Sequence, residues 1–370
     1  MNKLASSGQR IFIFILPLIF FPVFGFSGAF ALDNPDILIM FLKLSVIFVF
    51  IGFAAVLELK SMSLLKYGTL KSPKYYINIL IGLTIICGYF SFDSALQTYK
   101  LYLNNDLFGL NIIRAAVIEG DISRSFSGRL AGLFFIPMLL VGSFCAARFP
   151  FKDVRFLISI AFLIVLIHSI ATAGRNHLIL FFIAYLPVLS TRQGLIKSAI
   201  AFIFALSLLA LMQAIREVGT AVSGFESILD YIKMPWVGSE CYFNNCNGYF
   251  NNDGYKRFSG IILENYPFYY KGFHANVFGG LAQGHFLFGN LVFVWNVIIM
   301  AIACFLIFLP GDRSFTGFII SRWFFMYTFY YSIHDLVLFY GSFSFTPILI
   351  IIYKLLTILF NAKKVSTPLA

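Results

Sequence analysis

Charged side chains are scarce in this sequence of 370 residues, because Asp, Glu, Lys and Arg together make up only 12% of it. Soluble proteins carry about 25% charged residues. Hydrophobic residues reach 60%, and the mean hydropathy is +0.87. This composition argues against a soluble globular domain and indicates a chain that lies in a lipid bilayer.

Acidic groups, and the motifs that depend on them, are also rare. Asp and Glu number only 16. The sequence has no P-loop, no G-x-S-x-G nucleophile motif and no H-E-x-x-H zinc motif. It also lacks a D-x-D pair, by which many glycosyltransferases hold a metal ion and a nucleotide sugar. No basic block alternates with aromatic residues, so we expect no metal ion, no cofactor and no nucleic-acid partner.

Cysteine is infrequent as well, with five residues in the chain. Three of them lie in apolar segments, where a thiol packs as a small hydrophobic side chain. Cys241 and Cys246 share a long polar segment instead. An oxidising compartment would permit a disulfide between them, and two free thiols are the alternative. No second ligand pair lies nearby to support a zinc site.

Long apolar segments are what the sequence has in excess. A bilayer core about 30 Å thick needs roughly 20 apolar residues per helix, and lipid requires every backbone polar group to be paired. We therefore expect ten helical spans, at 11–32, 37–59, 76–96, 129–148, 154–173, 177–190, 195–214, 286–309, 315–332 and 337–360. The sequence thus predicts an all-α polytopic membrane protein in which residues 1–370 form a single integral membrane domain.

The positions of Lys and Arg indicate an orientation. With the N-terminus inside, 16 of the 27 cations fall on the inner side, mostly in short loops, as the positive-inside rule describes. Arg313 and Arg322 are counted among them. Both termini then lie in the cytoplasm, which an even number of spans allows. These loops and anionic lipid account for most of the net charge of +11.

Two outer loops are longer than the others. The first covers 97–128 and is expected to be the first larger periplasmic loop. The second covers 215–275, the long periplasmic loop, and is rich in Asn, Gly, Tyr and Phe. Aromatic rings stack on sugar faces and amides bond to hydroxyls, so this loop suits carbohydrate. An ordinary ordered outer loop is the alternative.

Arginines at the outer ends of helices are the main candidates for chemistry. Arg175 lies in a very short connection, Ala-Gly-Arg-Asn-His at 173–177. An arginine at this depth usually has a partner, and a guanidinium binds phosphate with two hydrogen bonds. Arg216 follows the seventh span and would be a second phosphate ligand at the same depth. The alternatives are an interfacial anchor for Arg175 and an exposed cation beside Glu217 for Arg216.

The segment that begins at His274 opens the eighth span. Asn276, Gly280 and Gln283 are spaced as one face of a helix. Gly280 and Gly284 form a GxxxG pair, which lets another helix approach closely. An imidazole that titrates near neutral pH, such as that of His274, can accept a proton from a sugar hydroxyl. A structural or helix-capping histidine is the alternative.

Four further polar residues have structural interpretations. Lys43 and Asp93 lie near the outer ends of their spans, and we expect them to pair across helices. His334 and Asp335 lie at the outer turn between the last two spans. Adjacent residues do not face each other on a helix, so they are not assigned as a dyad.

Together these features resemble a known family. A short outer hairpin with Gly174 and Arg175, and one long late outer loop, are typical of the Wzy-type O-antigen polymerases of the bacterial inner membrane. The segment after that loop is similar to the family's late helix start, with small polar residues and then Phe-Gly: Asn276, Gly279, Gly280, Gln283, Phe288 and Gly289.

The related O-antigen ligases share part of this pattern. They begin the segment with His-x-Asn, which His274 and Asn276 match. Their later glycines follow a fixed spacing that Gly284 and Gly289 do not meet, so the resemblance favours a polymerase. The paired Arg-x10-Gly motifs of some family members are absent at the two candidate arginines.

The resemblance implies a reaction at the periplasmic face, in which glycan moves from undecaprenyl diphosphate to a sugar hydroxyl of another lipid-linked repeat unit. Fixed cations stabilise the charge that develops on the departing diphosphate. We therefore assign Arg175 and Arg216 to diphosphate binding, His274 and Arg175 to catalysis, and Asn276 and Gln283 to glycan binding. The expected partners are the lipid-linked substrate and the bilayer, with a chain-length regulator and a flippase as candidate proteins.

Two other functions stay open at this point. A ligase would use the same chemistry to move glycan onto lipid A core. A flippase or transporter of lipid-linked oligosaccharide belongs to another class, and transporters usually show internal repeats and broken helices near the midplane. The sequence has no clear repeat, and its polar residues collect at the outer rim, which favours an enzyme.

Overall fold

The computed structural model is a helical bundle that ends in a small group of elements on one side. It describes residues 36–67, 72–105, 125–172, 174, 176–193, 224–244, 279–309, 312–331 and 335–365, with short pieces between 200 and 211 and between 269 and 274. The helices are α2 (Ile37–Tyr67), α3 (Pro73–Asn105), α5 (Phe126–Gly132), α6 (Phe135–Arg148), α7 (Phe151–Ala171), α8 (Asn176–Gln193), α10 (Gly224–Phe243), α11 (Gly280–Phe288), η3 (Gly289–Leu291), α12 (Val292–Phe308), α13 (Arg313–Tyr331), α14 (Leu336–Phe339) and α15 (Gly341–Val365). A two-residue strand pair, β1 (Tyr269–Tyr270) and β2 (Phe273–His274), is antiparallel.

The helical membrane character of the chain is confirmed. In the part of the chain that the structure describes, six helical segments are long and apolar enough to cross a bilayer: Ile37–Ser61, Pro73–Leu101, Phe126–Arg148, Phe151–Ala171, Gly289–Phe308 and Gly341–Leu359. A seventh, Asn176–Tyr185, is apolar but shorter. The expected span at 11–32 and most of that at 195–214 lie outside the described residues.

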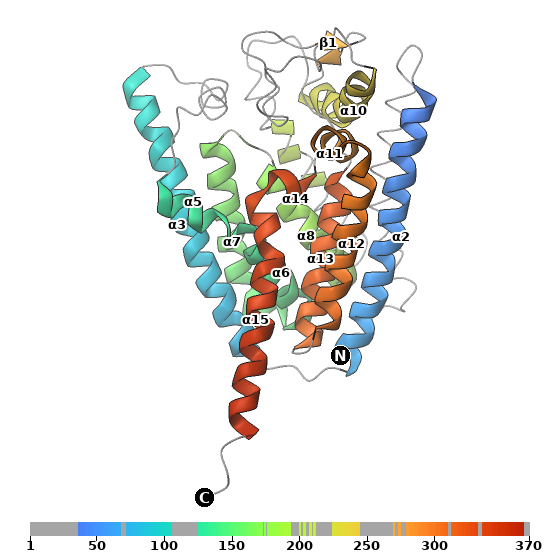
Figure 1. The fold of residues 1–370 in the computed structure, drawn as a ribbon. Helices are drawn as coiled ribbons and strands as arrows, with labels where there is room; N and C mark the ends of the chain where they lie inside the picture. The colour runs from blue at the N-terminus through green and yellow to red at the C-terminus, as the bar shows by residue number, and fades with distance from the viewer. Residues whose placement is uncertain are drawn as a thin grey trace, which may run out of the picture.

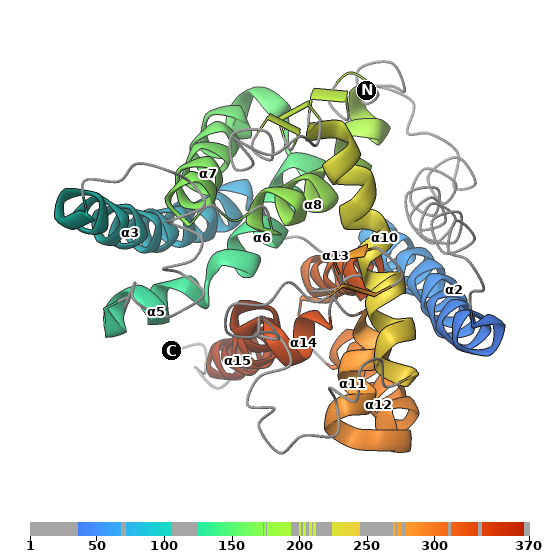
Figure 2. The ribbon, with the colours of Figure 1, turned by 90° about the horizontal axis from the view of Figure 1, so that it is seen from above.

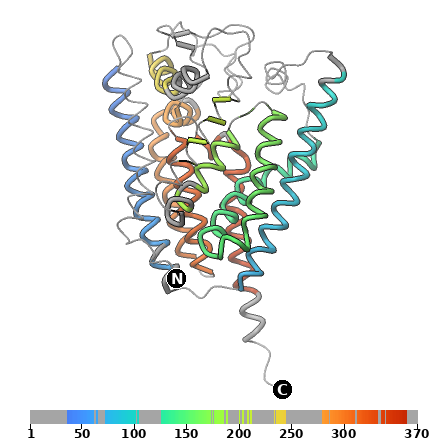
Figure 3. Tube along the Cα trace, turned by 180° about the vertical axis from the view of Figure 1, so that it is seen from behind, coloured from blue at the N-terminus to red at the C-terminus, as the bar shows by residue number. Residues whose placement is uncertain are grey.

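Successive helices run between two ends of the bundle. We call the end at which α10, β1 and α11 lie the upper end, as drawn in Figure 1, and the opposite end the lower end. α2, α6 and α12 end at the lower end, together with the last turns of α15 (Figures 1 and 3). α3, α7 and α13 end toward the upper end (Figure 1).

Helices that are consecutive in the sequence are not always neighbours in the bundle. Seen from above in Figure 2, α2 and α3 are consecutive but lie at opposite sides, and α6 and α13 lie between them. α13 packs against α2, α6, α8, α12 and α14, and almost all of its residues are buried. A helix that is buried all round belongs to the centre of a bundle. In its core contact with α2, the Phe50 ring lies 5.7 Å from Phe324 and 4.9 Å from Tyr331, centroid to centroid.

Polar contacts tie the lower end together. Asp312 precedes α13, and its Oδ1 accepts the Phe315 N–H at 3.2 Å. Its Oδ2 accepts hydrogen bonds from the hydroxyls of Tyr76 in α3 and Tyr353 in α15. Lys354 in α15 donates to the carbonyl of Leu309 at the end of α12, at 2.6 Å. One carboxylate and one ammonium group therefore connect four helices at this end.

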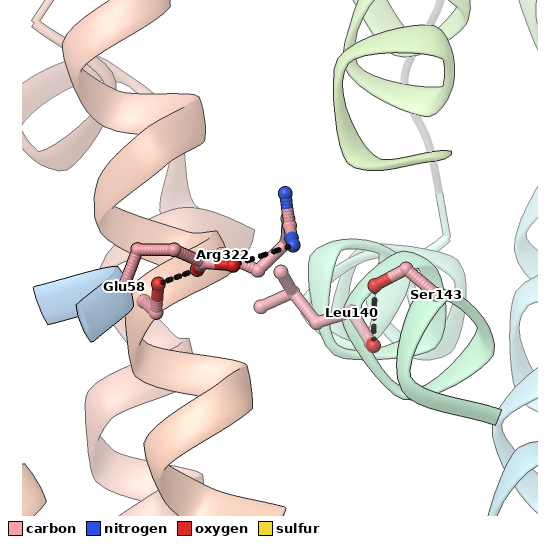
Figure 4. Close-up of polar contacts among 5 residues, drawn as sticks. Glu58, Leu140, Ser143 and Arg322 are labelled. Carbon is pink, nitrogen blue, oxygen red and sulfur yellow. Dashed lines mark hydrogen bonds and ion pairs between the residues drawn. The ribbon is translucent and has the colours of Figure 1, made fainter. Parts of the chain in front are cut away.

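A buried ion pair joins α2 and α13 inside the bundle. Arg322 was counted above among the inner-loop cations, but it lies in the middle of α13 and is buried. Its Nη2 lies 3.8 Å from Oε1 of Glu58, and the Ser321 hydroxyl donates to the other carboxylate oxygen at 2.5 Å (Figure 4). Rings of Phe318 and Phe325 lie 5.1 and 5.5 Å from the guanidinium. Arg322 therefore stabilises helix packing and carries no topology signal.

Replacing Glu58 by Gln should destabilise the protein, because it leaves the Arg322 charge buried without its carboxylate. Removal of one partner from a buried pair costs about 3–5 kcal/mol, whereas apolar replacement of both partners is often neutral. We expect a lower thermal midpoint in detergent for E58Q and recovery for Glu58→Leu combined with Arg322→Met. The exposed Asp153 of α7 supplies the control D153N. Equal midpoints for E58Q and D153N would contradict this interpretation.

Candidate functional site

Three tyrosines in the last turns of α13 organise the upper end of the bundle. The hydroxyl of Tyr327 donates to Asp335 Oδ2 before α14, at 3.2 Å. The hydroxyl of Tyr330 donates to Asn176 Oδ1, the first residue of α8, at 2.6 Å. The hydroxyl of Tyr331 donates to Asn296 Oδ1 in α12, at 3.2 Å. One buried helix thus fixes the upper ends of three others.

Asp335 is a completely buried carboxylate in the connection between α13 and α14. Its Oδ1 caps α14 by accepting the N–H groups of Val337 and Leu338 at 3.0 and 3.2 Å. Its Oδ2 accepts from Trp295 Nε1 at 3.0 Å in addition to Tyr327. Burial raises the pKa of Asp335 to about 6, although these hydrogen bonds act in the lowering direction.

Gln283, a predicted glycan contact, holds this same connection. It lies in α11 and is 1% exposed, and its Oε1 accepts the Asp335 backbone N–H at 2.8 Å. In this arrangement the Gln283 carboxamide is bound to protein. A glycan would meet it only after the turn at Asp335 moved away, so glycan binding by Gln283 stays a prediction that requires such a movement.

The start of α11 differs from the expected helix. α11 begins at Gly280 after an extended Gly279, and it contains Gln283 of the predicted polar face. Asn276, the first residue of that face, lies outside the described residues. The helix ends at Phe288, and Gly289 follows with a left-handed φ of 56°. Glycine tolerates this conformation at little cost. The membrane span begins at Gly289 rather than at 286. α11 is therefore a separate short helix at the upper end.

Close packing at the predicted GxxxG pair is confirmed. A Cβ on Gly280 would lie 2.5 Å from two ring carbons of Tyr331 in α13. A Cβ on Gly284 would lie 2.5 Å from Cγ2 of Val292 in α12. The absence of both side chains lets α11 sit directly on α13 and α12. This contact brings Gln283 to Asp335.

The hairpin that carries Arg175 is short, as predicted, because α7 ends at Ala171 and α8 begins at Asn176. Arg175 itself lies outside the described residues. Next to it, Asn176 is held by Tyr330, and the Tyr340 hydroxyl lies 2.8 Å from Nε2 of His177. The hairpin is thus anchored to α13 and to the residue before α15.

Of the other predicted site residues, His274, Arg216 and Asn276, the structure describes only the backbone of His274. The backbone of His274 lies in β2, paired with Tyr269, and β2 packs on α10. The His274 side chain, Arg216 and Asn276 lie outside what the structure describes. The elements that carry or flank His274, Gln283 and Arg175 all lie at the upper end (Figure 1).

Helix α10 lies within the segment predicted as a long outer loop. Seen from above, it crosses the bundle at the upper end (Figure 2), and its residues from Pro235 to Cys241 are buried. Cys241 is disulfide-bonded, which decides against a free thiol at this position, while Cys246 lies outside the described residues. Cys87, Cys145 and Cys304 are free. The outer segment is thus partly a packed helix.

The expected pair of Lys43 with Asp93 is wrong. Lys43 donates to the Pro235 carbonyl at 2.8 Å and to Ser239 Oγ at 3.0 Å, both in α10. Asp93 accepts from the Ser125 hydroxyl at 3.0 Å, at the start of α5. The two side chains therefore tie different helices, α2 to α10 and α3 to α5.

The three tyrosines of this site were not predicted from the sequence, and Asp335 was placed at an outer turn without a role. Tyr327, Tyr330 and Tyr331 are spaced i, i+3 and i+4, which places them on one side of a helix. Asp335 stands directly before an apolar run, a position typical of a helix N-cap. In an apolar chain with 19 tyrosines, however, tyrosines at this spacing are easily interpreted as a lipid-facing side of the helix.

No protein-family model, curated protein or solved structure matches the chain. Within the described ranges, no group of three or more His, Cys, Asp and Glu side chains has an arrangement that could hold a metal ion.

Replacing Gly280 by Ala should weaken the upper end, because the Tyr331 ring is buried and cannot retreat. Overpacking a filled core costs about 1–3 kcal/mol. We expect G280A to lower the thermal midpoint in detergent. Gly82 in α3 has no atom within 4 Å of an added Cβ, so G82A is the matched control and should be neutral or stabilising. A G280A protein as stable as G82A would show that α11 does not pack as described.

Burial of Asp335 predicts a specific pH dependence. Between pH 3.8 and about 6 the folded state keeps a proton that the unfolded state has released, so this contribution to stability is greatest below pH 3.8 and falls as pH rises through 6. The loss amounts to about 3 kcal/mol. The difference in thermal midpoint between wild type and D335N should therefore decrease from pH 4 to pH 7. A constant difference would contradict the assignment.

Proposed function

We propose that this protein polymerises lipid-linked oligosaccharide repeat units into O-antigen or a related surface polysaccharide. It does so at the periplasmic face of the bacterial inner membrane. The donor glycan is carried on undecaprenyl diphosphate, and the acceptor is a sugar hydroxyl of another lipid-linked unit. The upper end of the bundle is the periplasmic end in this proposal.

One observation carries the proposal: the two segments that resemble the polymerase family are both tied to the same end of α13. The hairpin around Arg175 is bound through Asn176 to Tyr330 of α13. The helix that follows the His274 segment is bound through Gln283 to Asp335, which accepts from Tyr327 of α13. A single buried helix therefore holds both segments at one end of the bundle, which supports a shared site for a lipid-linked sugar at that end.

The proposed reaction needs a base and a positive field. The acceptor hydroxyl oxygen bonds to the anomeric carbon of the donor, and the bond from that carbon to the diphosphate oxygen breaks. His274 takes the hydroxyl proton. Arg175 and Arg216 stabilise the charge on the departing undecaprenyl diphosphate. The energy comes from the sugar–diphosphate bond, so we assign no cofactor and no metal ion.

Substitution of Arg175 by Ala should abolish chain extension, because loss of one group that stabilises developing charge costs about 100-fold or more in rate. In a bacterium that depends on this gene for surface polysaccharide, we expect single repeat units on intact lipid A core, as in the deletion strain. Arg155 is exposed near the lower end of α7, so R155A is the control and should give a normal ladder. Expression of both variants is checked by immunoblot.

Other results would indicate another function. A full-length ladder from R175A would remove Arg175 from the mechanism. Long polymer left on undecaprenyl diphosphate in the deletion strain would indicate a ligase, and single units facing the cytoplasm would indicate a flippase. Reporter fusions that place 215–275 in the cytosol would overturn the proposal.

A further inference from the structure

We propose that Lys43 is a positioning residue that fastens α10 over the upper end of the bundle, and that acceptor binding depends on this contact. The inference rests on the proposed function for its consequence, but its geometry stands independently. We call the contact of Lys43 with Pro235, Trp236 and Ser239 the Lys43 latch.

The Lys43 ammonium is buried at an unusual place. It lies near the upper end of the membrane-spanning helix α2 and is 1% exposed. It donates to the Pro235 carbonyl at 2.8 Å and to the Ser239 hydroxyl oxygen at 3.0 Å, and it lies 4.4 Å from the centroid of the Trp236 ring. All three partners belong to the buried half of α10. A lysine inside a membrane segment is costly, so it is usually retained for a role.

The charge is compensated by dipoles and by an aromatic ring. Among the described residues, no carboxylate lies within 4.0 Å of the Lys43 ammonium. Asp36 and Glu240 also line the small cavity beside the Lys43 ammonium. Asp36 instead caps α2, because its Oδ1 accepts the N–H groups of Leu38 and Ile39. Lys43 is therefore aimed at α10 rather than at a carboxylate.

Ser239 also links Lys43 to the start of α11. Its Oγ accepts from Lys43, donates to the Pro235 carbonyl at 2.6 Å and accepts the Gly279 N–H at 3.3 Å. Gly279 is the residue directly before α11, and α11 carries Gln283. The latch thus connects α2, α10 and the start of α11 through one hydroxyl.

The position of α10 also determines the position of the proposed acceptor-binding elements. β2, which contains the His274 backbone, packs on α10. The hairpin around Arg175 is anchored to α13 instead. Loss of the Lys43 latch should therefore displace the acceptor-binding elements and leave the diphosphate-binding hairpin in place.

Replacing Lys43 by Met keeps the length of the side chain and removes the charge. Lys60 of the same helix is exposed, with its ammonium 5.3 Å from the Phe308 ring at the other end, so K60M is the matched control. S239A is a milder second variant that removes the shared hydroxyl. It supplies the test if K43M does not accumulate in the membrane.

The first measurement reports on α10 directly. Val237 is 0% exposed in α10, and V237C is labelled with a membrane-impermeant maleimide added to the periplasmic side. We expect labelling about tenfold faster in K43M and a smaller increase in S239A, because hydrogen bonds to a charged group are worth more than neutral ones. K60M should match wild type. Protection of V237C in both latch variants would overturn the inference.

The second measurement separates positioning from general damage. With purified lipid-linked repeat units, K43M should raise the KM about tenfold and leave kcat within about twofold, whereas K60M should change neither. A loss of kcat at unchanged KM would overturn the positioning role. Faster V237C labelling without any polymerase activity in the wild type would leave the latch standing and remove the proposed function. If the wild type is an active polymerase but V237C labelling in K43M and S239A is as slow as in wild type, the latch is overturned and the proposed function stands.

Discussion

The burial of α13 is the constraint on which the other features depend. A helix surrounded by other helices has no water for its polar side chains, so each one must find its partner in the protein. Tyr327, Tyr330 and Tyr331 meet this requirement by donating to three separate elements. The same hydrogen bonds that satisfy these hydroxyls fix the upper ends of α8, α12 and α14. The arrangement of the candidate site therefore follows from satisfying polar groups on a buried helix.

Buried charges in this protein are stabilised in three different ways. Arg322 has a carboxylate partner, Glu58. Asp335 is surrounded by hydrogen-bond donors, from two backbone amides, an indole and a phenol. Lys43 faces a carbonyl, a hydroxyl and an indole ring. The first lies inside the bundle and joins helices, whereas the other two lie at the upper end and hold short elements in place.

Local features of the fold were predictable, and long-range ones were not. The short connection before Asn176 and the close approach at Gly280 follow from length and from glycine, which act within a few residues. The hydrogen-bond partner of Lys43 could not be predicted in this way, because Pro235 lies 192 residues away in a segment with the composition of a polar loop. Pro235 lies inside α10, although proline disfavours a helix interior. The break at Gly289 was missed because the apolar run continues across it.

The sequence by itself determined that this chain is an α-helical membrane protein, since lipid admits only helices for apolar segments of this length and composition. Only the tertiary structure decided which helix is central and where the charged groups find partners. Hydrophobicity is nearly uniform along these helices and therefore does not distinguish a lipid-facing side from a protein-facing one. Hydrogen bonds between distant residues make that distinction, and they exist only once the helices are packed.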